Sequence, residues 1–130
     1  YGYPGAPRFP CQVGTGKGGP GLMEFPVSTA RWLGINWPIG GGFYVRALPY
    51  AVIRSGIQQL QRQGQPAILY MHPWELDPQQ PKVKQASAFN KFKHYTNIRK
   101  TGDKLKKLIE SFSHCRFTTC SEYLKQARKL

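Results

Sequence analysis

Acidic residues are scarce in this chain of 130 residues, which has 6 Asp and Glu against 19 Lys and Arg. Long hydrophobic runs are absent, and no stretch approaches the roughly 18 consecutive apolar residues that a membrane-spanning helix needs. No basic and apolar leader opens the chain, which begins with Tyr1 rather than Met. We therefore expect no membrane span, and either a processed protein or a part of a longer one.

Cysteine is equally rare, and its three positions exclude the usual cysteine-rich sites. Cys11, Cys115 and Cys120 form no CxxC pair, and no His lies at zinc-finger spacing from two of them. Three cysteines cannot all pair within one chain. Small apolar thiols fit a protein core, so we expect reduced, structural cysteines. Reduced thiols favour an intracellular, cytoplasmic location.

Motifs for several kinds of catalytic site are also missing. The histidines, His72, His94 and His114, lie about twenty residues apart and form no HxxxH or HExxH pair. No serine lies in a nucleophile-elbow motif. The glycine-rich turn at 38–42 lacks a following Lys-Ser or Lys-Thr, which favours a tight turn beside a site over a phosphate-binding loop. The chain therefore predicts no metal site of its own.

Positive charge is what the chain has in excess, and it is concentrated in the second part. Residues 82–130 carry 13 basic and 3 acidic side chains, whereas residues 1–81 carry 6 basic and 3 acidic ones. A net charge of +13 attracts polyanions, either nucleic acid or acidic polysaccharide. Lysine-rich helix faces that are simply solvated would give the same composition, so charge alone does not decide between these interpretations.

Alternating and helical spacings of apolar residues together predict an α/β fold. The expected elements are a strand at 22–28, a helix at 48–63 capped by Gly64, a strand at 67–72, an unstructured connection at 77–98, an amphipathic helix around 105–112, a strand at 116–118 and a last helix that starts at a capping box at 119–122. Strands that alternate with helices predict a few parallel strands with amphipathic helices. So few strands leave open sheet edges, which favour self-association. Residues 1–21, with seven Gly and four Pro, predict an irregular segment ahead of a domain at 22–130.

The most informative stretch follows the apolar run at 67–71, where His72, Trp74, Glu75 and Asp77 come close together. Folds of the α/β class place ligands beyond the carboxyl ends of their strands, so this cluster is the predicted site. His72 is the candidate general acid, because imidazole titrates near neutrality and can protonate a leaving amine or alcohol. Trp74 offers an apolar face on which a sugar can stack, and Glu75 and Asp77 are placed to orient the imidazole.

Several motifs in this chain resemble one bacterial enzyme family. They are GLMEFPVST at 21–29, PIGGGFY at 38–44, YMHPWELDP at 70–78 and HYT at 94–96, and the opening YGYPGAPRFP at 1–10 is similar as well. Together they resemble the C-terminal part of bacterial NodB-like polysaccharide deacetylases, in the subgroup linked to exopolysaccharide and PEP-CTERM sorting loci. The resemblance covers essentially the whole chain.

This resemblance implies the C-terminal half of a distorted (β/α) barrel that removes N- or O-acetyl groups from a polysaccharide with a divalent metal, for which zinc is expected. Leu69-x-x-His72 matches the family's last motif, in which the Leu walls the acetyl pocket and the His protonates the departing amine. The family's Asp-Asp pair and His-x-x-x-His, which supply the metal ligands and the catalytic base, are absent from this chain. The implied partners are a polysaccharide and the missing N-terminal half of the barrel. The isolated chain is expected to bind no metal and to be inactive.

Three functions therefore compete. The first is the acid-bearing half of a deacetylase, a hydrolase that acts on C–N bonds other than peptide bonds. The site residues expected for it are His72 as the catalytic acid and, as glycan contacts, Leu69, Trp74, Glu75 and Glu24. The second is a non-catalytic carbohydrate-binding module, and the third is a basic nucleic-acid-binding domain, although the aromatic residues match no known nucleic-acid-binding motif. Glu75 paired with Asp77 or with Glu24 stays open as a glycosidase-like pair of carboxylates.

Overall fold

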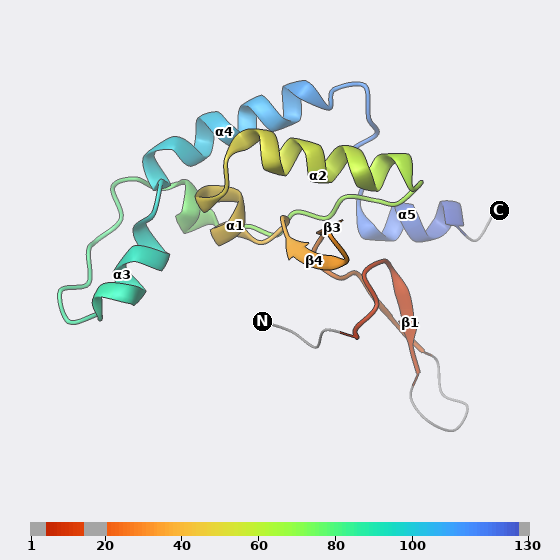
Figure 1. Ribbon diagram of the computed structural model, residues 1–130, viewed down its shortest axis with the longest axis horizontal. Coiled ribbons are helices and arrows are strands. Elements are labelled where there is room, and N and C mark those ends of the chain that lie inside the picture. Colours follow the sequence, from red (N-terminus) through yellow and green to blue (C-terminus); the bar gives the residue numbers. More distant parts are fainter. Residues whose placement is uncertain (1–4, 15–20, 128–130) are drawn as a thin grey trace.

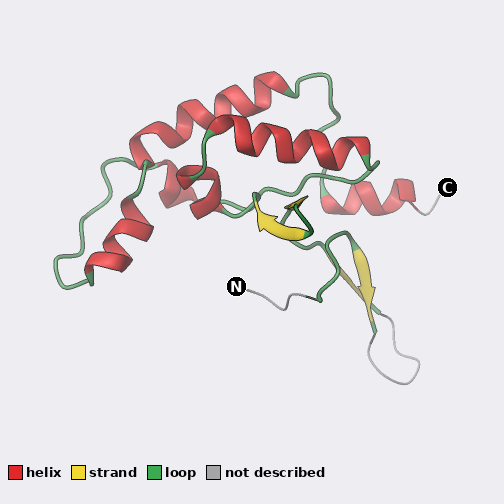
Figure 2. Ribbon diagram, viewed as in Figure 1, coloured by secondary structure: helices red, strands yellow, loops and turns green. Residues whose placement is uncertain are grey.

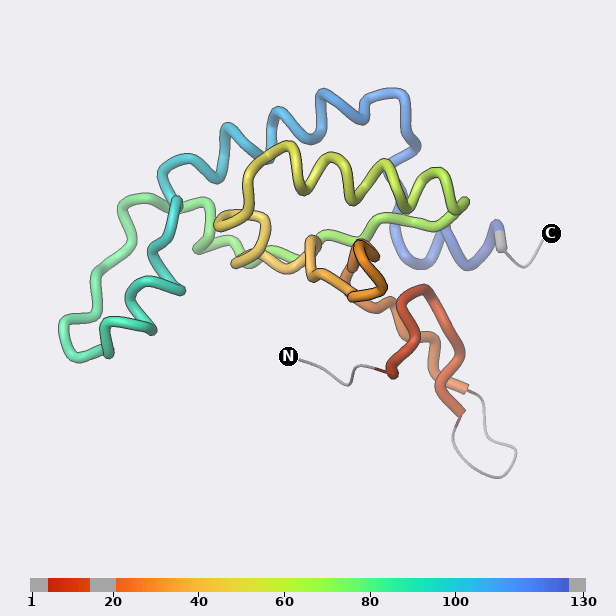
Figure 3. The backbone as a smooth tube through the Cα atoms, in the orientation of Figure 1, coloured from red at the N-terminus to blue at the C-terminus, as the bar shows by residue number. Residues whose placement is uncertain are grey.

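The computed structural model describes residues 5–14 and 21–127 of the chain. Its elements, in chain order, are β1 (Cys11–Val13), β2 (Leu22–Glu24), β3 (Thr29–Trp32), β4 (Ile35–Pro38), α1 (Gly42–Ala47), α2 (Tyr50–Arg62), the 3₁₀ helix η1 (Pro73–Leu76), α3 (Ala88–Tyr95), α4 (Ile98–Ser111) and α5 (Cys120–Ala127). Helices dominate and the strands are short (Figures 1 and 2). In the view of Figure 3, α2 and α4 run along one long edge, and α3 projects at one end. Every helix in the described part of the chain is too short or too polar to cross a bilayer.

The strands form two separate antiparallel hairpins. β1 pairs with β2, and β3 pairs with β4. The β3–β4 turn has a positive φ at Leu33 (52°) and at Gly34 (79°), which is the backbone that a two-residue hairpin turn requires. Within residues 5–14 and 21–127, parallel pairing is limited to one bridge between Gly41 and Tyr70. The mixed α/β class is therefore confirmed, but the prediction of a few parallel strands was wrong, and no barrel closes among the described residues.

The segment predicted as a strand at 67–72 is extended but forms no ladder. Its side chains alternate as those of a strand do: Leu69 and Met71 pack against the core, whereas Tyr70 and His72 are exposed. Its backbone hydrogen bonds are isolated and lie along one edge only. A regular strand needs a partner backbone along its whole length, and no such partner lies beside this segment in the described part of the chain.

Ser28 holds that extended segment in place from a buried position. The Ser28 N–H donates to the carbonyl of Ile68 (3.1 Å), and the Ser28 hydroxyl accepts the N–H of Ile68 (2.7 Å). The Ser28 carbonyl accepts the N–H groups of Ile39 and Gly40, both at 3.0 Å. The Tyr70 N–H then donates to the carbonyl of Gly40 (2.8 Å). One serine therefore joins three stretches of chain that are far apart in the sequence.

Two further predicted strands differ from the structure. The strand expected at 22–28 ends at Glu24, and the Pro26 that follows has no N–H with which to continue a ladder. Residues 116–118 form no strand but an exposed link between α4 and α5. Conversely, β1 lies inside the segment 1–21 that is expected to be irregular, part of which falls outside the described residues.

The helix predicted at 48–63 is confirmed as α2, and its inner face contributes Ile53, Ile57 and Leu60 to the core. The buried core residues are Ala30, Ile39, Val45, Ile53, Ile57, Leu60, Leu108 and Phe112. Gly64 ends α2 as predicted, with a φ of 66° that a side chain would disfavour. The Gly64 N–H donates to Gln61 (2.9 Å) and the Gln65 N–H to Leu60 (3.0 Å), which satisfies two of the last carbonyls of the helix.

The capping box predicted at 119–122 is confirmed at the start of α5. The Thr119 hydroxyl accepts the N–H of Glu122, and the Glu122 carboxylate accepts the N–H of Thr119, both at 3.2 Å. The backbone hydrogen bond from Thr119, with a smaller contribution from the Thr118 hydroxyl, lowers the pKa of the Glu122 carboxyl. The last helix therefore begins where the sequence pattern places its start.

Residues 77–98, predicted as a connection without regular structure, contain α3. The Ser87 hydroxyl caps this helix by accepting the N–H of Asn90 (3.2 Å). The usual signal of a helix is an apolar face that turns into the core. In α3 the apolar residues Phe89 and Phe92 are exposed instead, so the spacing of apolar residues did not indicate a helix here.

Lys104 connects α4 to the end of α1. α4 includes the helix predicted around 105–112 and begins earlier, at Ile98. The Lys104 ammonium donates at 2.8–3.0 Å to the carbonyls of Leu48, Val45 and Arg46. These are carbonyls that α1 leaves without helical partners, so the lysine caps that helix. Burial lowers the pKa of the Lys104 ammonium.

We expect Lys104→Met to lower the free energy of unfolding by about 1–3 kcal/mol, because hydrogen bonds to a charged donor are lost at once. Chemical denaturation followed by circular dichroism measures this change. Lys106→Met is the matched control, since Lys106 lies two positions on with its side chain 77% exposed. That control should change stability by less than about 0.5 kcal/mol. Equal effects of the two substitutions would contradict the capping role.

Candidate functional site

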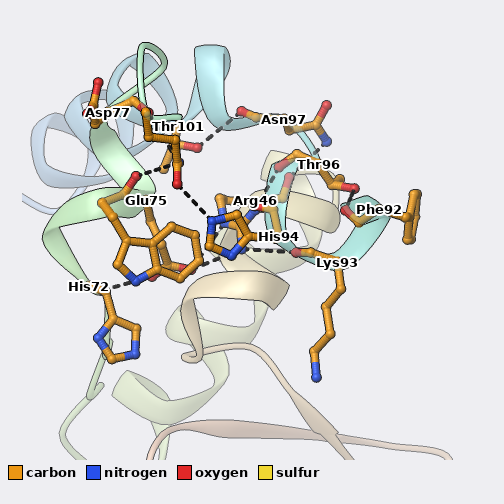
Figure 4. Close-up of polar contacts among 12 residues, drawn as sticks. Arg46, His72, Glu75, Asp77, Phe92, Lys93, His94, Thr96, Asn97 and Thr101 are labelled. Carbon is orange, nitrogen blue, oxygen red and sulfur yellow. Dashed lines mark hydrogen bonds and ion pairs between the residues drawn. The ribbon is translucent and has the colours of Figure 1, made fainter. Parts of the chain in front are cut away.

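A buried ion pair between Arg46 of α1 and Glu75 of η1 organises the candidate site (Figure 4). The two side chains are 1% and 3% exposed, and the guanidinium Nη2 and Nε atoms both lie 3.1 Å from Glu75 Oε1. A buried ion pair is stable only when its other donors and acceptors also have partners. Every buried side-chain nitrogen and oxygen in the described part of the chain has one.

Arg46 uses its remaining donors to cap α3. Its Nη1 donates to the carbonyls of His94 (2.8 Å) and Thr96 (3.0 Å), and its Nη2 donates to the carbonyl of Lys93 (3.2 Å). A positive charge at the C-terminal end of a helix also interacts favourably with the helix dipole. One side chain therefore ties α1, η1 and α3 together.

Glu75 uses its second oxygen to hold the backbone of His72. Glu75 Oε2 accepts the N–H of His72 (2.8 Å), and the His72 carbonyl accepts the N–H of Glu75 (3.0 Å). This reciprocal pair closes the first turn of η1, directly after the extended segment that ends at His72. The backbone of His72 is therefore held in place by Glu75, which is in turn held by Arg46.

Glu75 can reach Arg46 because Gly42 has no side chain. A Cβ atom at Gly42 would lie 1.9 Å from Oε2 and 2.3 Å from Oε1 of Glu75, far inside van der Waals contact. The glycine-rich turn at 38–42 therefore lies beside the site, as the sequence predicts. The space beside Gly42 is occupied by a carboxylate of the protein itself, that of Glu75.

Four aromatic rings follow one another across the site. The ring centroids of Tyr70 and His72 lie 4.8 Å apart edge to face, and the rings of His72 and Trp74 are nearly parallel at 5.8 Å. Trp74 is stacked on His94 at 4.0 Å with an interplanar angle of 8°. The guanidinium carbon of Arg46 lies 5.3 Å from the Trp74 ring. The exposed His72 imidazole therefore lies between the rings of Tyr70 and Trp74, and Trp74 is itself held by His94 and Arg46.

Gln80 completes the support of this aromatic stack. Its side-chain carbonyl lies 2.7 Å from His94 Nε2, and its amide nitrogen donates to the backbone carbonyl of Trp74 (3.0 Å). Because His94 covers one face of the Trp74 indole, that face is closed to a sugar ring. We therefore assign Trp74 to positioning His72 and not to stacking a glycan on that face.

The structure brings together three of the five predicted site residues. His72, Trp74 and Glu75 form the site described above. Leu69 lies on the opposite face of the extended segment, where it lines an apolar cavity of about 420 Å³ between α2, α4 and α5 that His72 does not line. Glu24 is exposed on β2, in a hairpin that projects away from α1 and η1 (Figure 1).

Neither carboxylate beside His72 contacts its imidazole. Both oxygens of Glu75 are engaged within the protein, so this buried residue takes a structural role in place of a glycan contact. Asp77 accepts the N–H of Gln79 (2.8 Å) and so stabilises the turn after η1. The glycosidase-like pairs of Glu75 with Asp77 or Glu24 lack support, because Glu75 is bound to Arg46.

Arg46, His94 and Gln80 were not predicted from the sequence as parts of the site. The signal for Arg46 was a single charge inside the otherwise apolar stretch 43–48, where a helix face turns toward the core. His94 stands in one of the motifs quoted for the family resemblance, but no spacing rule links it to Trp74. Contacts between elements distant in the chain are not encoded in local periodicity.

The described residues form no group of three or more His, Cys, Asp or Glu that could hold a metal ion. His72 and His94 lie on either side of Trp74, and Glu75 is bound to Arg46. The residues present therefore do not fit the divalent metal that the family resemblance implies.

Comparison with known proteins gives one match. A protein-family model described as "Domain of unknown function (DUF3473)" matches residues 1–125. No curated protein and no solved structure matches the chain. The matched range includes the whole of the site, from Gly42 to Thr96.

We expect Arg46→Met to lower the free energy of unfolding by about 3–5 kcal/mol, because Glu75 would remain buried without a counter-charge. Glu75→Leu should have an effect of similar size for the converse reason. In the double variant the loss should be smaller than the sum of the two single losses by at least about 1 kcal/mol. Urea-induced unfolding measures all three, and strict additivity would contradict direct coupling of the pair.

We expect Gly42→Ala to destabilise the fold by about 2 kcal/mol or more, because a methyl group would displace the Glu75 carboxylate. Gly102→Ala in α4 is the matched control, since a Cβ there meets nothing within 4 Å. That control should be neutral or stabilising by up to about 1 kcal/mol, from helix propensity alone. Thermal unfolding of both variants tests this, and a tolerated Gly42→Ala would contradict the steric argument.

Proposed function

The chain belongs to the family described as "Domain of unknown function (DUF3473)", and we propose that it forms the acid-bearing part of a metal-dependent polysaccharide deacetylase. The observation that carries the proposal is the position of His72. This exposed imidazole ends an extended segment, is flanked by two rings, and is held at its backbone by a buried ion pair. A proton donor needs a fixed position and access to substrate, and His72 has both.

The open edge of the extended segment supports the idea that a further part of the barrel joins here. Ile68 and Tyr70 form backbone hydrogen bonds toward Ser28 and Gly40. The backbone of Leu69, which faces the other edge, forms none with the described residues. An exposed edge of this kind is a template for another strand. We propose that the metal-binding half of the barrel pairs with this edge and faces His72, although a second copy of the chain could also use it.

In the proposed reaction, His72 acts when the bond to the acetyl group breaks. The imidazolium donates its proton to the departing amine nitrogen of an N-acetyl group, or to the alcohol oxygen of an O-acetyl group. Without this proton the leaving group would depart as an unstable anion. Tyr70 and Trp74 restrict the rotation of the ring, and Glu75 fixes the backbone that carries it.

A polysaccharide substrate is consistent with the charge of the chain. The net charge of +13 favours a polymer with anionic groups and increases the rate at which such a polymer is encountered. The free thiols of Cys11, Cys115 and Cys120 fit a reducing compartment such as the cytoplasm. The charge favours an anionic class of glycan, and the thiols favour a reducing compartment.

We expect His72→Ala to lower kcat for acetate release by roughly 10² to 10⁴, the usual range for the loss of a general acid. The measurement requires the longer gene product that carries the proposed metal-binding half. KM should change much less, because the proton is needed only in the transition state. His114→Ala is the control, since His114 is exposed in the turn after α4 and far from Trp74 in the chain.

The 130-residue chain alone should release no acetate with or without added divalent metal, because about three ligands are needed to activate water on such an ion. Acetate release by the isolated chain would contradict the proposal that the metal-binding residues lie in another part of the protein. An unchanged kcat with a raised KM in His72→Ala would assign His72 to glycan binding and would contradict its role as the general acid.

A further inference from the structure

Residues 78–96, which comprise the loop after η1 and helix α3, form an arm that projects from one end of the molecule (Figures 1 and 3). The arm has a defined shape, because hydrogen bonds connect its loop to its helix. The Tyr95 hydroxyl donates to the carbonyl of Pro81 (3.1 Å) and accepts the N–H of Val83 (2.9 Å). The Lys91 ammonium donates to the carbonyl of Lys84 (2.7 Å). Loop and helix therefore hold each other in one shape, and Arg46 fixes the base of the arm.

The arm and the turn that follows it contain no acidic residue. Between Pro78 and Gly102 there is no Asp or Glu. The cationic residues in the same stretch are Lys82, Lys84, Lys91, Lys93, Arg99 and Lys100. An acid-free stretch with this many cations repels cations and attracts an anionic partner along its whole length.

The arm also exposes large apolar side chains. Phe89 is 70% exposed, Phe92 is 61% exposed, and Val83 in the adjoining loop is 55% exposed. The two phenylalanines are three positions apart and so share one face of α3. His94, on the opposite side of α3 from the phenylalanines, is held by Gln80, and Tyr95 at the end of the helix is held by the loop. The exposure of the phenylalanines is therefore not the mark of a loose fold, because other side chains of α3 are held by Gln80 and by the loop.

We infer that the tip of this arm binds the surface of an anionic lipid bilayer. Apolar aromatic side chains beside lysines on a short amphipathic helix are the composition of segments that lie in the membrane interface. The phenylalanines would enter the headgroup region, and the lysines would contact acidic headgroups. The shape favours a flat partner, because the arm is a projecting end, and the cavities beside α4 are lined by residues outside it. A glycan or nucleic-acid strand is held better in a groove. This inference does not rest on the proposed deacetylase activity.

Co-sedimentation of the 130-residue chain with vesicles tests the inference. We expect binding to phosphatidylcholine vesicles that contain roughly one-third phosphatidylglycerol, and at least about tenfold weaker binding to vesicles of phosphatidylcholine alone. Phe89→Ser/Phe92→Ser should weaken binding to the anionic vesicles by about tenfold or more, through loss of buried apolar area. Lys82→Gln/Lys84→Gln should weaken it by about tenfold and reduce its dependence on salt between about 0.1 and 0.5 M.

Phe117→Ser is the matched control, because Phe117 is 64% exposed but lies outside the arm. This control should bind anionic vesicles as the parent chain does, and circular dichroism should give the same spectrum for all variants. Vesicle binding that is indifferent to the phenylalanines, or lost in the longer gene product, would overturn the inference. So would a Phe89→Ser/Phe92→Ser variant that keeps vesicle binding but loses binding to single-stranded DNA or to polygalacturonate.

Discussion

Arg46 donates to acceptors on two separate elements from a position that water does not reach. A buried guanidinium is stable only while its acceptors stay in place, so the Glu75 carboxylate and the carbonyls at the end of α3 are needed together. Through Glu75 the same charge fixes the backbone of His72, and through α3 it fixes His94 beneath Trp74. The exposed imidazole of His72 is therefore positioned by an ion pair that is itself buried.

The remainder of the fold is arranged so that this contact can form. Lys104 caps α1, the helix that carries Arg46, and Ser28 holds the segment that leads to His72. The core residues of α2 and α4 pack against α1 and against the extended segment. The outer edge of the extended segment and the outer face of α3 stay uncovered, and they are the two surfaces on which partners are proposed.

Two helix ends that depend on local spacing were predicted correctly from the sequence. They are the end of α2 at Gly64 and the capping box of Thr119 and Glu122, since each is decided by residues within one helical turn. The cluster around His72 was found because its residues are adjacent in the chain. Strand partners and the roles of Arg46 and Glu75 were not predictable, because they depend on which distant segments meet. The alternation at 67–72 describes an extended backbone correctly, but it cannot say whether a second backbone lies alongside.

The space that Gly42 leaves for the Glu75 carboxylate has a consequence for how this sequence can change over time. A larger residue at this position is acceptable only after the Glu75 carboxylate has gone, and that carboxylate can go only if Arg46 no longer leaves an isolated charge behind. Each single step away from the trio thus passes through a less stable intermediate. The three positions are therefore constrained together by the stability of the fold, independently of what the exposed imidazole does.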